Sequence, residues 1–198
     1  GKILSNSIYK NYFKVCLNLG SGDINHLTRS KPWVDKNVFS HLRLEGVKIL
    51  HVDAFNFPGV DLVQDLSVPE ALNFVSTTEA PRLFILANVL EHIPKYAVEE
   101  LINKIYKAMS IGDALLITVP YDYPFHADPI DTMYRPSPTE LTSLAPLNWN
   151  EQSIITSGSY KEEFLEMGVF KRLRKLLKPL WIFQKFLPER SVLPSRPE

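Results

Sequence analysis

The sequence predicts an α/β fold in which a mostly parallel central sheet carries helices on both faces. Short, nearly continuous apolar runs recur along the 198-residue chain, as in strands that are buried on both faces. Helical patterns separate some of these runs, and strands that alternate with helices form parallel sheets. A composition of 45% hydrophobic and 22% charged residues is that of a globular domain with a core.

The predicted elements follow from these runs in chain order. A candidate short helix at residues 4–13 comes before the first run. The predicted strands are residues 15–19, 47–52, 60–63, 82–87 and 114–119. The clearest predicted helix is residues 95–109, and Pro94 is expected in its first turn. Its apolar residues recur at helical spacing: Val98, Leu101, Ile102, Ile105 and Met109.

Residues that can bind a ligand follow the predicted strands. Ligands bind such sheets beyond the carboxyl ends of the strands. The first run ends in a Gly-Ser-Gly turn at residues 20–22, where exposed backbone N–H groups can bind a carboxylate or phosphate. The second run ends at Asp53, which can accept hydrogen bonds from both hydroxyls of a ribose. The third ends at Asp65 and the fourth at Asn88. Four such positions in succession predict a cofactor site.

The spacing of the turn argues against a dinucleotide. A dinucleotide turn reads Gly-x-Gly-x-x-Gly, with its acidic partner about 20 residues further on. Here Asn25 stands at the third glycine position and Asp53 lies much further along the chain. An NAD-dependent oxidoreductase is therefore the less favoured alternative.

Four segments together resemble a known enzyme family. They are LNLGSG, HVDAFNFPGVDLVQDL, LANVLEHIP and DALLITVPYDYPFHADPIDTMYRPSPTEL. Over residues 14–145 the chain resembles a class I S-adenosylmethionine-dependent methyltransferase, closest to the small bacterial type 11 enzymes of glycan pathways. The resemblance implies a Rossmann-like fold and methyl transfer to a small molecule or a glycan precursor, with S-adenosylhomocysteine as the product. It also implies a seven-stranded sheet, whose last strand is not located here.

The resemblance implies a role for each strand end. Gly20, Ser21 and Gly22 would approach the methionine part of the cofactor, and Asp53 would accept from the ribose. Asp65 and the backbone at Leu66 would lie by the adenine, and Asn88 would border the sulfonium. Two positions depart from the family pattern: Asn18 replaces the usual acid of the first strand, and Ile24 replaces the third glycine. Asn18 is still expected at the cofactor.

The segment after the fifth run is expected to cap the cofactor and bind the acceptor. Residues 119–138 hold five prolines and four aromatic residues. His126 is the candidate general base, since its pKa lies near neutral pH. Asp131 would orient that base or bind substrate hydroxyls, and Arg135 would hold a substrate carboxylate or phosphate. Tyr121 and His92 are expected to face the same cleft. The alternative, that these groups only tie the loop together and Arg135 pairs with an acid, stays open.

A basic amphipathic segment predicts a boundary near the carboxyl end. We expect a methyltransferase domain at residues 1–168 and a tail at 169–198. Residues 170–187 read FKRLRKLLKPLWIFQKFL, a leucine stripe among lysines and arginines. This pattern suits an anionic membrane surface. The alternative is a helix that packs on its own domain or on a dimer partner.

Charge and composition exclude some of the remaining classes of function and of binding site. The formal net charge is zero, so we expect no nucleic-acid partner. The histidines lack metal-ligand spacing, and no metal site is expected. The lone Cys16 lies in an apolar run and is expected in the core. A cytoplasmic location is expected, peripheral to the inner membrane face if the tail binds lipid. A catalytically inactive methyltransferase-like scaffold remains the second class of function.

Overall fold

The computed structural model describes residues 11–123, 130–155 and 168–169 of the chain. It divides into two compact units, residues 1–154 and 155–198. The predicted tail at 170–187 and most of the predicted helix at 4–13 lie outside the described residues. The fold below is that of the first unit.

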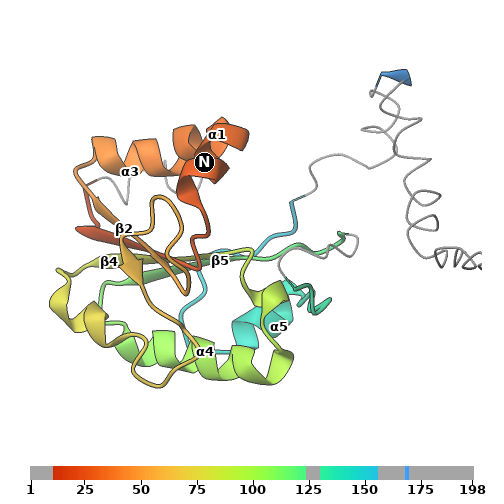
Figure 1. Cartoon of the computed structure of the whole chain (residues 1–198). Helices are drawn as coiled ribbons and strands as arrows, with labels where there is room; N and C mark the ends of the chain where they lie inside the picture. Colours follow the sequence, from red (N-terminus) through yellow and green to blue (C-terminus); the bar gives the residue numbers. More distant parts are fainter. Residues whose placement is uncertain (1–10, 124–129, 156–167, 170–198) are drawn as a thin grey trace, which may run out of the picture. The chain divides into compact units, whose positions relative to one another are not determined.

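Five parallel strands form one sheet in the order β3-β2-β1-β4-β5 (Figure 1). The strands are β1 Val15–Leu19, β2 Lys48–Asp53, β3 Leu62–Val63, β4 Arg82–Ala87 and β5 Ala114–Thr118. The predicted α/β class and parallel sheet are confirmed, with small differences at the strand ends. Asp53 is the last residue of β2 rather than the residue after it. The strand order reverses at β1, because β2 and β3 extend to one side of it and β4 and β5 to the other.

Helices cover both faces of the sheet. Figure 1 shows α1 and α3 on one face and α4 and α5 on the other. The α-helices are α1 Ile24–Ser30, α2 Pro32–Val34, α3 Ser40–Leu44, α4 Lys95–Ala108 and α5 Pro138–Ser143. A π-helical turn η2 Asp35–Phe39 joins α2 to α3, and short 3-10 turns form η3 Asn73–Thr77 and η4 Leu90–His92.

The start of α4 differs from its prediction. Pro94 was expected in the first turn, but it precedes the helix in an extended conformation, with φ −55° and ψ 138°. The chain enters the helix at Lys95, and Met109 follows its last residue. A proline just outside a helix is tolerated for the same reason as one in the first turn, because no intrahelical N–H bond is lost.

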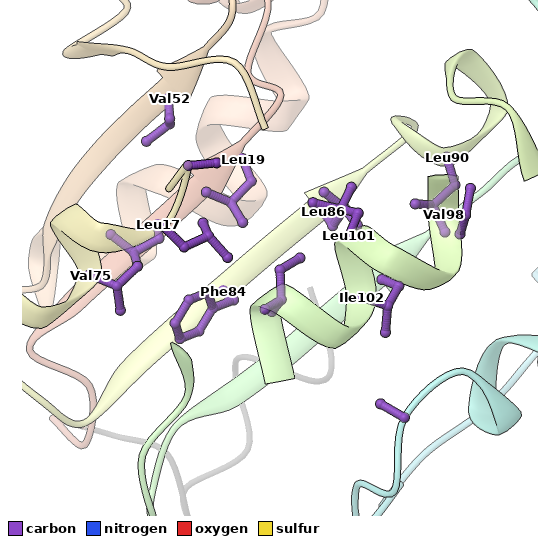
Figure 2. Close-up of a cluster of buried hydrophobic side chains, with 14 of the residues drawn as sticks. Leu17, Leu19, Val52, Val75, Phe84, Leu86, Leu90, Val98, Leu101 and Ile102 are labelled. Carbon is purple, nitrogen blue, oxygen red and sulfur yellow. The ribbon is translucent and has the colours of Figure 1, made fainter. Parts of the chain in front are cut away.

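Alternate residues of β1 enter two separate hydrophobic clusters. Leu17 and Leu19 pack toward α4, where the buried residues Phe84, Leu86, Val98, Leu101 and Ile102 surround them (Figure 2). Cys16 points the other way and packs with Leu42 of α3. Side chains alternate across a strand, so a central strand covered on both faces is buried throughout, as every residue of β1 is. This double burial holds the carboxyl ends of β1, β2 and β4 at one edge.

Candidate functional site

The glycine turn after β1 is tied to the end of β2. Gly20 and Gly22 have φ of +69° and +63°, a left-handed conformation that glycine adopts without strain. The N–H groups of Gly20 and Ser21 both donate to the Val52 carbonyl oxygen, at 2.8 and 3.0 Å. The Gly22 N–H donates to Oδ2 of Asp53 at 2.7 Å. These three amides were expected to be exposed for an anionic ligand, and they are instead engaged with β2.

The two glycines of the turn have different surroundings. A Cβ atom added to Gly20 would lie 2.6 Å from Cγ2 of Val89, which follows β4. A Cβ added to Gly22 would meet no atom within 4 Å. The absence of a side chain at Gly20 therefore lets the segment after β4 pack onto the turn. The side of the turn at Gly22 faces open space, where a ligand can approach the backbone.

Asp53 is a buried carboxylate beside this open side. Its Oδ2 accepts from the Gly22 N–H and its Oδ1 accepts from the Phe55 N–H at 3.0 Å. An ionised carboxylate offers about four acceptor positions, so these two bonds leave capacity for about two more. The geometry suits a ligand that brings a pair of hydroxyl donors to the end of β2.

The other predicted cofactor residues also follow strand ends. Asp65 is exposed, and its Oδ1 accepts from the Ser67 N–H at 2.8 Å. Hydrogen bonds from Ser67 lower the pKa of Asp65, so its carboxyl is ionised at neutral pH. Leu66 is half-buried and packs on the larger hydrophobic cluster. Asn88 is exposed with φ +55°, and its N–H donates to the Thr118 carbonyl oxygen at 2.8 Å.

Asn18 is buried in β1, directly opposite His51 of β2. Nδ2 of Asn18 lies 3.0 Å from Nδ1 of His51, at hydrogen-bond distance. Burial lowers the pKa of His51, against smaller opposing effects of nearby carboxylates. The neutral residue that replaces the expected acid is therefore paired with a histidine of the neighbouring strand.

The structure pairs two of the residues predicted for the acceptor site. Nη2 of Arg135 lies 2.6 Å from Oδ2 of Asp131, and Oδ1 of Asp131 accepts from the Met133 N–H at 2.7 Å. The Asp131 side chain is 0% exposed and that of Arg135 is 11% exposed. The sequence left open whether Arg135 holds a substrate anion or pairs with an acid of the chain. In the structure the Arg135 guanidinium pairs with an acid, Asp131.

The segment that contains this pair returns to the turn after β4. The N–H and hydroxyl of Thr132 both donate to the Glu91 carbonyl oxygen, at 2.8 and 2.9 Å. Nδ1 of His92 lies 2.8 Å from the Ile130 carbonyl oxygen. Residues 130–135 are thereby anchored to η4, at the carboxyl edge of the sheet. Tyr121 is exposed just after β5, and His126 lies outside the described residues.

An exposed aromatic pair adjoins Asp53 and did not enter the sequence prediction. Phe55 and Phe57 are 66% and 40% exposed, and their ring centroids lie 5.6 Å apart. The pattern DAFNF, two aromatic residues shortly after an acid at a strand end, is the signal that could have found them. Exposed rings next to a carboxylate that retains acceptor capacity can contact the flat or apolar part of a ligand.

A groove of about 710 Å³ lies away from this edge. It is lined by residues 114–116 at the start of β5 and by residues 147–151. Its walls include Ser110 and Asp113, which come before β5, so the groove belongs to the opposite end of that strand. We therefore place the candidate site at the carboxyl edge and not in the groove.

Within the described ranges, no three histidine, cysteine, aspartate or glutamate side chains are grouped so that they could hold a metal ion. Among the same residues, no helix has the length and apolar character needed to cross a membrane. Comparison of the chain with protein-family models, with curated proteins and with solved structures gives no match.

Proposed function

We propose that this chain is an S-adenosylmethionine-dependent methyltransferase whose acceptor is a small molecule or a sugar or glycan precursor. One observation carries the proposal. A buried carboxylate, Asp53, lies hydrogen-bonded to a left-handed glycine turn where the strand order of a parallel sheet reverses. Open α/β sheets bind their ligands at the carboxyl edge beside such a reversal.

The residues of this edge suit the parts of that cofactor. The remaining acceptor capacity of Asp53 matches the two hydroxyls of a ribose. The open side of Gly22 leaves room for the backbone to approach a ligand, and the rings of Phe55 and Phe57 offer an apolar contact. When bound, S-adenosylmethionine supplies an electrophilic methyl group on its sulfonium.

The acceptor side of the proposal rests on the segment after β5. His126 is proposed as the base that takes a proton from the acceptor. Asp131, whose side chain is fully buried against Arg135, is proposed as the group that orients this base and not as a substrate ligand. The described end of this segment is anchored, because Thr132 is hydrogen-bonded to η4 and Asp131 is paired with Arg135. An anchored end favours a cap that keeps water from the reacting atoms.

A catalytically inactive binding protein is the second candidate, and two observations favour it. Asn18 brings no charge to the site, and the guanidinium of Arg135 is already neutralised by Asp131. A site of this kind could hold the cofactor without turning it over. Binding and turnover therefore have to be measured separately.

Calorimetric titration of the full chain tests the proposal. We expect S-adenosylmethionine and S-adenosylhomocysteine to bind, and NAD not to bind. Asp53→Asn keeps the size and one acceptor of the side chain but removes its charge. It should weaken S-adenosylhomocysteine binding by about 1.5–3 kcal/mol, the value of hydrogen bonds to a charged group.

The matched control is Glu70→Gln, which removes an equal charge from an exposed side chain. Its affinity should stay within about twofold of the wild type. NAD binding in place of S-adenosylhomocysteine would identify an oxidoreductase, and binding of neither would refute the proposal. Binding without methyl transfer to any tested glycan or small-molecule acceptor would favour the inactive class.

A further inference from the structure

Three polar side chains, those of Asn18, His51 and Asp53, lie together on the face of the sheet that α3 covers; we call them the polar column. Cys16 of β1 and Leu42 of α3 belong to the hydrophobic cluster on this face. Asn18 is two residues beyond Cys16, so it points to the same side. His51 is opposite Asn18 in the parallel ladder, and Asp53 is two residues further along β2. The column ends at the glycine turn, because Asp53 accepts from the Gly22 N–H.

The His51 ring is held in a fixed place. It meets the ring of Phe39 edge to face, with centroids 5.0 Å apart and planes at 87°. The His51 backbone N–H donates to Oδ2 of Asp61 at 2.8 Å, and its carbonyl oxygen accepts from the Asp61 N–H at 2.8 Å. With ring and backbone both held, Nδ1 lies 3.0 Å from Nδ2 of Asn18.

The structure places the Asn18 amide with Nδ2 toward the His51 ring and Oδ1 away from it. An amide nitrogen only donates, so in this orientation Nδ1 of His51 accepts and the neutral ring carries its proton on Nε2. With Nδ2 bonded to the ring, Oδ1 of Asn18 remains as the acceptor. A fixed acceptor oxygen is complementary to a cationic or N–H donor group of a ligand. A freely turning amide would present either its oxygen or its nitrogen to that group, so it would be less well preorganised for binding.

We propose that His51 is a positioning residue that keeps the Asn18 amide turned with its oxygen toward the cofactor, and that protonation of the ring reverses this orientation. The inference rests on the proposed function, because Oδ1 would accept a hydrogen bond from the ammonium group of the cofactor's methionine part. In the protonated ring Nδ1 becomes a donor, so Asn18 must turn its oxygen to His51 and present Nδ2 in its place. The cofactor ammonium then meets a donor, and binding weakens on acidification.

Burial and three charged groups determine the pKa of the His51 ring. Burial has the largest effect and lowers the pKa of His51. Asp61, beside β3, raises it, Arg43 on α3 lowers it, and Asp35 on η2 raises it. The neutral, acceptor form of the ring is therefore the form present at neutral pH. Loss of cofactor affinity is expected as pH falls below about 6.5, the ordinary pKa of histidine.

Proton NMR of the imidazole groups tests the contact without any ligand. The His51 resonance is identified by its loss in His51→Gln, and it should titrate below about 6.5 in the wild type. Asn18→Asp places a carboxylate beside the ring, which should raise the titration midpoint by about 1–3 pH units. An unmoved His51 midpoint in folded Asn18→Asp would overturn the proposal.

Calorimetry of S-adenosylhomocysteine binding between pH 5 and 8 tests the consequence. Wild type should lose at least about threefold in affinity on acidification through the His51 midpoint. The pH dependence should be absent in His51→Gln and retained in the control His41→Gln. If wild type and His51→Gln vary alike with pH, His51 is only structural and the proposal is wrong. Failure of every variant to bind would refute the proposed function, while the NMR midpoints would still decide whether His51 holds Asn18.

Discussion

Replacing Gly20 with alanine should destabilise the protein by two separable effects. The residue has φ of +69°, and a left-handed conformation costs a residue with a Cβ roughly 1–2 kcal/mol. The new Cβ would also lie 2.6 Å from Cγ2 and 3.1 Å from Cγ1 of Val89, closer than atoms in contact allow. Overpacking of this kind costs about 1–3 kcal/mol. The expected loss of unfolding free energy for Gly20→Ala is therefore about 2–5 kcal/mol.

Gly22→Ala and Val89→Ala separate the two effects. Gly22 has nearly the same backbone conformation, φ +63°, but an added Cβ would meet no atom within 4 Å. It should cost only the roughly 1–2 kcal/mol of the left-handed conformation. Val89→Ala removes both Cγ atoms, and the nearest remaining side-chain atom is Val89 Cβ at 3.5 Å, an ordinary contact. The double variant Gly20→Ala, Val89→Ala should thus recover the overpacking cost.

Urea unfolding of the full-length variants, followed by circular dichroism, measures these free energies. A double-mutant cycle between positions 20 and 89 should give a favourable coupling energy of about 1–3 kcal/mol. Equal losses in Gly20→Ala and Gly22→Ala, or additive losses in the cycle, would show that Val89 does not pack on the turn. Either result would refute the geometry from which the candidate site is built.

Two further predictions concern buried groups at the core. Arg82→Met should cost about 3–5 kcal/mol of unfolding free energy, because it leaves the fully buried Asp113 carboxylate without its ion-pair partner. Arg43→Met breaks an ion pair whose arginine is 51% exposed and should cost at most about 1 kcal/mol in the same denaturant assay. Burial raises the pKa of the Cys16 thiol to about 12, so the native protein should resist alkylation by iodoacetamide at pH 8 and react only as it unfolds. Rapid labelling of Cys16 under native conditions, followed by mass spectrometry, would contradict its place in the core.

The strands were predictable because both faces of the sheet are covered. Every residue of β1 is buried, and the first five residues of β4 are buried as well. Such strands need uninterrupted apolar runs, which stand out in any sequence. Helix α4 was predictable for a related reason, since its buried residues Val98, Leu101, Ile102 and Ile105 all lie on one stripe.

The helical stretch from α1 to α3 had no comparable pattern. Few of its residues are buried: Ile24, Phe39 and Leu42. A π-helical turn between α2 and α3 also interrupts the regular helical repeat. A helix that buries so few side chains carries little periodic signal, and its position is decided by the sheet face that it covers.

The residues of the candidate site were predictable as kinds of residue at strand ends, but their partners were not. The sequence by itself determined the α/β class, the runs that become strands, and the glycine turn, Asp53 and Asn88 beyond them. Only the tertiary structure decided that Asp53 holds the Gly22 amide, 31 residues away, and that Asn18 meets His51, 33 residues away. Strand order and register bring such side chains together, and both depend on how the helices and strands pack across the whole sheet. The local sequence pattern around a residue indicates whether that residue is buried. It does not indicate which distant residue will be its polar partner.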